Sequence, residues 1–191
     1  FRPGNLLISA RSLSTIFLLD RETGRVLWSF NRELDLQHEA LMIPSGFPGQ
    51  GRIMLFNNRY HSFYRDRQSA LLEVDPLSDD ILWRYEDDAF YSPTAGVEQP
   101  LPNGNILVGS TRGGRAFEIT RSGEIVWEWV PPFDPRRPRR YSYDHTPQLA
   151  ALAHPEERAV TAAPAYRHVD RDVYRFARRG KMRKVRVGGR R

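Results

Sequence analysis

The sequence predicts an all-β protein, a partial β-propeller of about three four-stranded blades, and two observations carry that prediction. The same phrase occurs three times: a short turn, and then a strand that carries Trp. The three residues Trp28, Trp83 and Trp127 recur at intervals of roughly 40 to 55 residues, near the length of a propeller blade. Each phrase also follows a turn signal and two short apolar runs, as expected for antiparallel strands joined by tight turns.

The first two strands of each repeat are continuous apolar runs. Runs of about five apolar residues suit strands that are buried on both faces between stacked blades. Turn signals precede them, such as the Asn103-Gly104 pair, because a type I′ turn needs positive φ at both central residues. The expected strands are residues 6–8 and 15–19, 53–56 and 70–74, and 106–108 and 115–119.

The third strand of each repeat alternates apolar and polar residues, which predicts one buried and one exposed face. A Trp side chain at this point buries on the order of 200 Å². We therefore expect Trp28, Trp83 and Trp127 to pack between neighbouring blades and not against a ligand. The turns before these strands need a left-handed residue, and Gly24, Asp79 and Gly123 stand there.

The remaining strand of each sheet is expected to line the central channel. The segments in this position are residues 38–44 and 92–99, and residues 141–149 follow the third Trp strand. Polar and small residues concentrate in them. Because propellers bind ligands at the mouth of the channel, we look for chemistry on these segments and on the loops before them.

Residues 1–153 are expected to form the blades, and residues 154–191 a basic, disordered tail. Three blades do not close a ring, so we expect the chain to be the C-terminal part of a larger propeller. The net charge of +6 comes from the tail, which holds 12 Lys and Arg residues against 4 acidic ones. A nucleic-acid partner is therefore not expected for the blades, and the tail is the weak exception.

Several classes of chemistry are excluded by composition. The chain has no Cys, so it has no disulfide, no zinc–cysteine site and no thiol nucleophile. No apolar run is long enough to span a bilayer. Phosphate-loop, calcium-loop and nucleophile-elbow patterns are absent, and the sequence predicts neither a metal site nor a bound cofactor.

Histidine and arginine are the candidate catalytic residues. His38 opens an expected channel strand, where an imidazole can act as a base, a metal ligand or a nucleophile, and Arg59 could hold an anion. The alternative is a rim histidine that caps the end of a strand. His145 is placed similarly, although Asp144 and Pro147 suit a structural turn as well.

A polar, aromatic loop follows Arg59. Its aromatic side chains could stack on an aromatic substrate while its arginines pair with the charge of that substrate, or the loop could be a solvated excursion. The expected substrate-binding residues are Asn58, Tyr60, His61 and Tyr91.

Taken together, these repeats and several further motifs resemble the arylsulfotransferase family of bacterial β-propellers, over about residues 3–161. The more specific part is Gln-His-Glu-Ala at residues 37–40 joined to the Asn-Asn-Arg loop at residues 57–59. The turn-and-Trp phrase alone is shared with quinoprotein dehydrogenases, whose PQQ-like repeats it resembles. Further matching motifs lie at residues 90–93, 101–105, 123–128 and 141–149.

The resemblance implies a six-bladed propeller, periplasmic or secreted, that moves a sulfuryl group from a phenolic sulfate ester to a phenol through a sulfated histidine. It implies that His38 binds sulfate and that Arg59 clamps the sulfuryl oxygens, since fixed cationic donors stabilise the charge that develops there. Small phenols would be the partners, and a homodimer is a further expectation.

One departure from the family leaves a second function open. The family places the sulfated histidine in the blade after the arginine, but no histidine lies between residues 62 and 144 here. Either another residue, such as His145, takes that part, or the protein is a noncatalytic propeller used for binding or assembly. Quinone-dependent oxidation would need a cofactor seat and calcium ligands that these residues do not supply.

Overall fold

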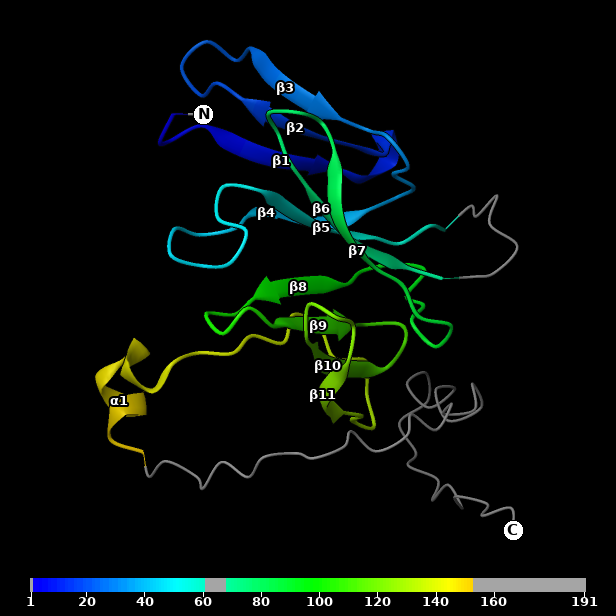
Figure 1. Ribbon diagram of the computed structural model, residues 1–191, viewed down its shortest axis with the longest axis vertical. Coiled ribbons are helices and arrows are strands. Elements are labelled where there is room, and N and C mark those ends of the chain that lie inside the picture. The colour runs from blue at the N-terminus through cyan, green and yellow to red at the C-terminus, as the bar shows by residue number, and fades with distance from the viewer. Residues whose placement is uncertain (1, 61–67, 153–191) are drawn as a thin grey trace.

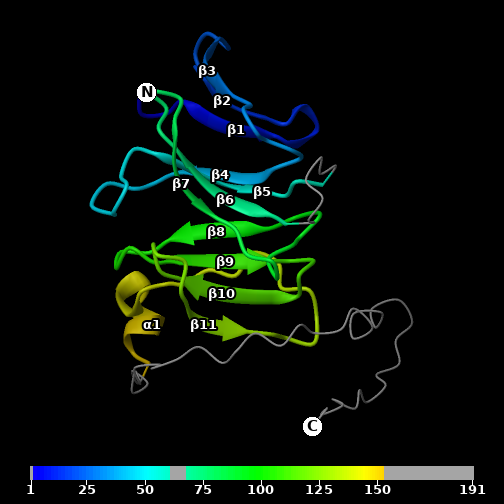
Figure 2. The same cartoon turned by 45° about the vertical axis from the view of Figure 1, so that its right-hand side comes forward.

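Three antiparallel sheets follow one another along the chain and stack along the long axis of the molecule (Figures 1 and 2). The structure is a computed structural model that describes residues 2–60 and 68–152. Sheet A has the strand order β1-β2-β3, sheet B the order β4-β5-β6-β7, and sheet C the order β8-β9-β10-β11. The predicted all-β, blade-like architecture is confirmed, with three strands in the first sheet and four in the others.

The strands are short, and nearly all have five residues. Sheets B and C each have one strand more than sheet A, namely β4 and β8. Each of these strands comes from the segment that follows the Trp strand of the preceding sheet, and β4 contacts both β1 and β8. The bounds are β1 Leu6–Ala10, β2 Thr15–Leu19, β3 Val26–Phe30, β4 His38–Met42, β5 Ile53–Asn57, β6 Ala70–Val74, β7 Ile81–Tyr85, β8 Val97–Pro100, β9 Ile106–Ser110, β10 Arg115–Ile119 and β11 Ile125–Trp129, with the short helices η1 Arg11–Leu13, η2 Tyr143–His145 and α1 Pro147–Ala150.

The last two strands of each sheet share the same irregularity, and a left-handed residue stands in each turn between them, although the turn of sheet C at residues 120–124 is one residue shorter than those at residues 20–25 and 75–80. The strand pairing shifts register at Leu18/Leu19, at Glu73/Val74 and at Glu118/Ile119. The predicted left-handed residues are confirmed, since the φ angles of Gly24, Asp79 and Gly123 are 68°, 62° and 89°.

Apolar side chains fill the two spaces between the sheets. Ile16, Phe30 and Leu55 belong to the core between sheets A and B. The core between sheets B and C is aromatic. Phe90 makes edge-to-face contacts with Phe56 and Phe117 at centroid distances of 5.2 and 5.6 Å.

Two of the Trp residues tie each sheet to the next, as predicted. Trp28 of sheet A donates its indole N–H to Asp79 of sheet B at 2.8 Å. Trp83 of sheet B donates to the carbonyl oxygen of Arg121 of sheet C at 2.9 Å. Both acceptors lie in the turn between the last two strands of the next sheet.

The strand expected at residues 141–149 is wrong, because this segment forms η2 and α1 instead. The Thr146-Pro147 pair is the physical reason. Pro147 fits the first turn of a helix, where its missing N–H is not needed, and the Thr146 hydroxyl accepts the N–H of Leu149 at 3.2 Å. The predicted basic tail and His61 lie outside the described residues.

Candidate functional site

The imidazole ring of His38 is held between sheet B and the loop that leads to sheet C. His38 begins β4, the inner edge of sheet B. Its Nδ1 lies 2.7 Å from the Oδ1 of Asn58, and its Nε2 accepts the backbone N–H of Ala95 at 3.1 Å. Because Asn58 presents an acceptor and Ala95 a donor, Nδ1 carries the proton and Nε2 keeps the lone pair.

Asn58 is fully buried and forms hydrogen bonds both with His38 and with the loop that leads to sheet C. Its amide nitrogen donates to the carbonyl oxygens of Ser92 and Ala95, each at 2.7 Å. Ala95 has a φ of 57°, a left-handed conformation that is costly for a residue other than Gly. The asparagine therefore fixes both the ring of His38 and the loop that contacts it.

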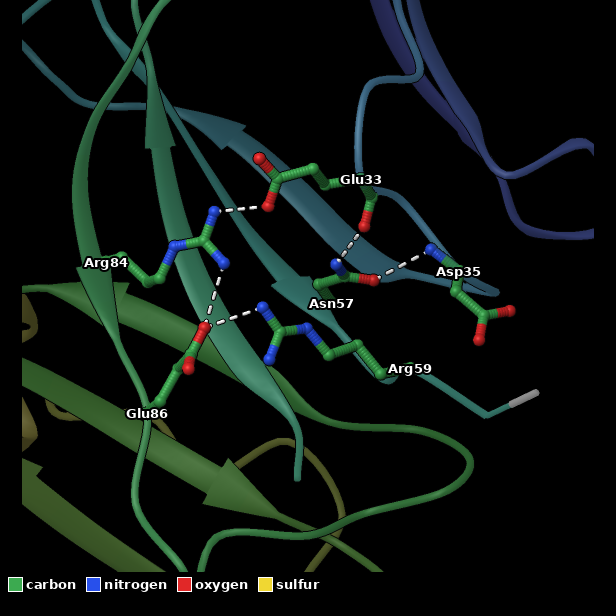
Figure 3. Close-up of polar contacts among 6 residues, drawn as sticks. All are labelled: Glu33, Asp35, Asn57, Arg59, Arg84 and Glu86. Atoms are coloured by element: carbon green, nitrogen blue, oxygen red, sulfur yellow. Dashed lines mark hydrogen bonds and ion pairs between the residues drawn. The ribbon is translucent and has the colours of Figure 1, made fainter. Parts of the chain in front are cut away.

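Arg59 belongs to a different group of side chains (Figure 3). Its guanidinium is buried and pairs with Glu86 at 2.6 Å. Glu86 also pairs with Arg84 at 2.8 Å, and Arg84 pairs with Glu33 from the loop after sheet A. Burial opposes ionisation of the Glu86 carboxyl, but Arg84 and Arg59 outweigh it and lower the pKa of that group.

Asn57 and Asn58 explain why the two groups separate. Successive residues of a strand point to opposite faces. Asn57 lies on the side of sheet A, where it donates to the carbonyl of Glu33 at 2.7 Å and accepts the N–H of Asp35 at 2.9 Å (Figure 3). Asn58 turns toward the loop before sheet C. His38 and Arg59 thus lie at the same end of sheet B, yet their side chains contact different partners.

The other predicted site residues are less closely joined. Tyr60 is half exposed directly after Arg59, and Tyr91 is partly buried beside Ser92. His145 is exposed, and its ring lies against that of Tyr141 at a centroid distance of 4.6 Å and an interplanar angle of 39°. It is followed by α1, which lies at the opposite end of the sheets from the point where β5 ends in both views (Figures 1 and 2). The structure does not bring His145 to His38.

The sequence did not indicate that a carboxyl group on β8 is buried. Glu98 is fully buried, and neither carboxyl oxygen has a hydrogen-bond partner among the described residues. Burial, with the nearby charge of Glu39, raises the pKa of Glu98 well above its usual range, and Arg139 offsets this only in part. Arg139 donates to the Glu98 carbonyl at 2.9 Å and pairs with Glu39 at 2.6 Å. Nothing in the sequence distinguishes Glu98 from a solvent-facing strand residue.

The raised pKa of Glu98 predicts how stability depends on pH. The folded protein binds this proton more tightly than the unfolded chain, so stability falls as pH rises from about 4.5 through the raised pKa. Glu98→Gln is expected to remove that decline, which thermal denaturation across pH measures. The same decline in the variant would assign it to other groups.

Neither a metal-ligating cluster nor a membrane-spanning helix is found among the residues that the structure describes. Those residues contain no group of three or more metal-ligating side chains. None of their helices has the length and apolar character needed to cross a bilayer.

Comparison with known proteins identifies the family. The model of the family described as arylsulfotransferase (ASST) matches residues 1–131. The chain belongs to the arylsulfotransferase family. This match includes His38, Asn58 and Arg59 but ends before His145. No curated protein matches the chain.

A solved propeller structure supports the fold of this arylsulfotransferase-family chain. The WD40 β-propeller domain of Doa1 superposes with a TM-score of 0.50 at 17% identity, over 68% of this chain and 37% of that one. A protein of unknown function from Bacteroides caccae matches with a TM-score of 0.47 at 20% identity, over 66% of this chain and 42% of that one. The chain thus spans less than half the length of each of these structures.

Proposed function

We propose that this chain is a sulfuryl-transferring propeller that moves the sulfuryl group of a phenolic sulfate ester to a phenol through His38. Membership of the arylsulfotransferase family carries the proposal. The proton position on His38 supports it, since a hydrogen bond that holds Nδ1–H leaves the lone pair of Nε2 for attack. A periplasmic or secreted location is part of the proposal.

The transfer would take two balanced steps. In the first, Nε2 of His38 attacks the sulfur of the ester, an N–S bond forms, and the S–O bond breaks as the phenolate leaves with its electron pair. In the second, the acceptor phenol attacks the sulfur and the N–S bond breaks. The acceptor's proton ends on the released phenol.

The surroundings of His38 supply two of the parts that this reaction needs. Asn58 would keep the ring oriented while Nε2 carries the sulfuryl group. The N–H of Ala95, which Nε2 now accepts, would be released and would lie beside a sulfuryl oxygen, where a backbone donor stabilises developing negative charge. Attack therefore requires the loop at residues 92–95 to move by a small amount.

A noncatalytic binding propeller is the second candidate, and a specific observation favours it. Both ring nitrogens of His38 have protein partners, and the Arg59 guanidinium pairs with Glu86. Both groups that the family resemblance assigns to the sulfuryl oxygens thus have partners within the protein.

A transfer assay separates the two candidates. With an aryl sulfate donor and a phenol acceptor, His38→Asn is expected to lower kcat by about a thousandfold or more, as for loss of a covalent nucleophile. Intact-mass measurement with donor alone should show one added sulfuryl group on wild type and none on His38→Asn.

His145→Asn completes the comparison. We expect this variant to retain transfer, because its ring is exposed at the other end of the sheets. Loss of transfer in His145→Asn with full activity in His38→Asn would contradict the proposal, and absence of transfer in wild type would favour the binding propeller.

A further inference from the structure

One extra residue in β4 decides which way His38 faces. Phe56 of β5 lies opposite His38. The preceding residue of β5, Leu55, lies opposite Ala40, so Glu39 has no partner on β5. Such an extra residue is a β-bulge, and bulges change the direction of neighbouring side chains.

The two cores show what the bulge does. Leu55 and Ala40 pack in the core between sheets A and B, whereas Phe56 belongs to the core between sheets B and C. In a regular strand His38 would lie on the same face as Ala40, two residues away. The bulge turns it to the face of Phe56 instead, where its ring meets the loop that leads to sheet C.

The backbone of Glu39 is strained, and an ion pair to another sheet offsets the strain. Its φ is 39°, a left-handed conformation that is costly for a residue other than Gly. Its carboxylate pairs with Arg139 at 2.6 Å. The same guanidinium donates to the carbonyl of Glu98 on β8 at 2.9 Å. Arg139 thus joins the bulge of sheet B to the edge strand of sheet C.

The neighbours of Arg139 are fixed on sheet C. The side chain of Gln99 accepts the backbone N–H of Arg140 at 2.8 Å and donates to its carbonyl at 2.9 Å. Pro138 packs so closely on Gly109 that a Cβ on that glycine would lie 2.6 Å from Cδ of the proline. Residues 138–140 are therefore anchored to β8 and β9, and they hold the Arg139 side chain toward sheet B.

We propose that Arg139 is a positioning residue for His38. Its ion pair with Glu39 holds the bulge, and the bulge keeps the imidazole beside Asn58 and the loop that leads to sheet C. Without the pair, β4 can relax toward regular pairing, in which His38 turns away from that loop. Arg139 lies outside residues 1–131, which the family model matches. The effect on transfer rests on the proposed function, whereas the effect on the ring does not.

The first test is NMR of the full 191-residue chain with 15N-labelled histidine, at a pH above the usual pKa of His. His38→Asn identifies the His38 signals among those of the five histidines. In wild type the two ring nitrogens should have widely separated chemical shifts, because Nδ1 carries the proton and Nε2 the lone pair. In Arg139→Ala we expect the two shifts to approach each other, because the ring loses its fixed partners and the proton exchanges between the nitrogens.

The second test is the transfer assay. Arg139→Ala is expected to lower kcat about tenfold or more and to change KM less than about twofold, because it misplaces the nucleophile and not the substrate. Arg140→Ala is the matched control. It also removes an arginine ion pair, to Glu118 of β10 at 2.5 Å, but keeps the backbone hydrogen bonds to Gln99. It should leave the His38 shifts unchanged and kcat within about twofold.

Two substitutions at Glu39 test the bulge itself. Glu39→Ala and Glu39→Gly both remove the ion pair, but Gly adopts a left-handed conformation without a steric penalty. We expect Glu39→Ala to behave like Arg139→Ala. Glu39→Gly should keep the wild-type His38 shifts and a kcat about fivefold or more above that of Glu39→Ala.

Unchanged His38 shifts in Arg139→Ala, or equal losses of kcat in Arg139→Ala and Arg140→Ala, would overturn the proposal. Equal losses in Glu39→Gly and Glu39→Ala would do so as well, since backbone strain would then play no part. If wild type transfers no sulfuryl group but the ring nitrogens respond as expected, the proposed function is wrong and the positioning role stands.

Discussion

Gly96→Ala is expected to lower the free energy of unfolding by about 3 to 5 kcal/mol, because it combines backbone strain with overpacking. Gly96 has a φ of 132°, a conformation that L side chains rarely adopt. A Cβ there would lie 2.6 Å from Cζ of Phe56, and that ring is fully buried in the core between sheets B and C. Urea denaturation measures the loss.

Gly46→Ala separates the two causes. Gly46 also has a positive φ, of 84°, but a Cβ there meets no atom within 4 Å. The free energy of unfolding of Gly46→Ala should fall by about 1 kcal/mol, from backbone strain alone. An equal loss in the two variants would mean that the Phe56 ring yields and that the close approach of Gly96 to this ring contributes nothing.

Asn58→Asp is the second large effect, with an expected loss of about 3 to 5 kcal/mol at neutral pH. The change keeps the shape of the side chain but replaces two donated hydrogen bonds with a buried carboxylate facing the carbonyls of Ser92 and Ala95. The loss should shrink as the pH falls and the new carboxyl group takes up a proton. Chemical denaturation at neutral and acid pH measures both quantities.

The control for this variant is Asn103→Asp, the same substitution in an exposed turn. Its Oδ1 accepts the N–H of Asn105 at 3.0 Å, which a carboxylate also does. We expect a change within about 0.5 kcal/mol. A loss at Asn58 no larger than this would show that the loop at residues 92–95 does not depend on the asparagine.

Much of the fold could be predicted because its signals are local. Positive φ at Gly24, Asp79 and Gly123 follows from the chemistry of a tight turn within a few residues. The packing of Trp28 and Trp83 between sheets follows from their place in an alternating strand. Each of these features needs only a short window of sequence.

The site was less predictable because its contacts cross between strands. Arg59 was expected beside His38, but Glu86, 27 residues further along the chain, pairs with its guanidinium. A register shift between His38 and Ala40 also changes which side chains of β4 face sheet C. At residues 141–149 the repeat predicted a strand, but Thr146 and Pro147 begin a short helix there.

The strand pairing shifts register at the same place in all three sheets, at Leu18/Leu19, Glu73/Val74 and Glu118/Ile119. This shared position bears on how such chains evolve. Since every sheet has this shift at the same place, a duplicated stretch of gene that encodes residues 38–85 would insert a sheet with the same strand pairing as its neighbours. Recombination can thus add a sheet without changing how its strands pair, while the side chains between the sheets adapt afterwards.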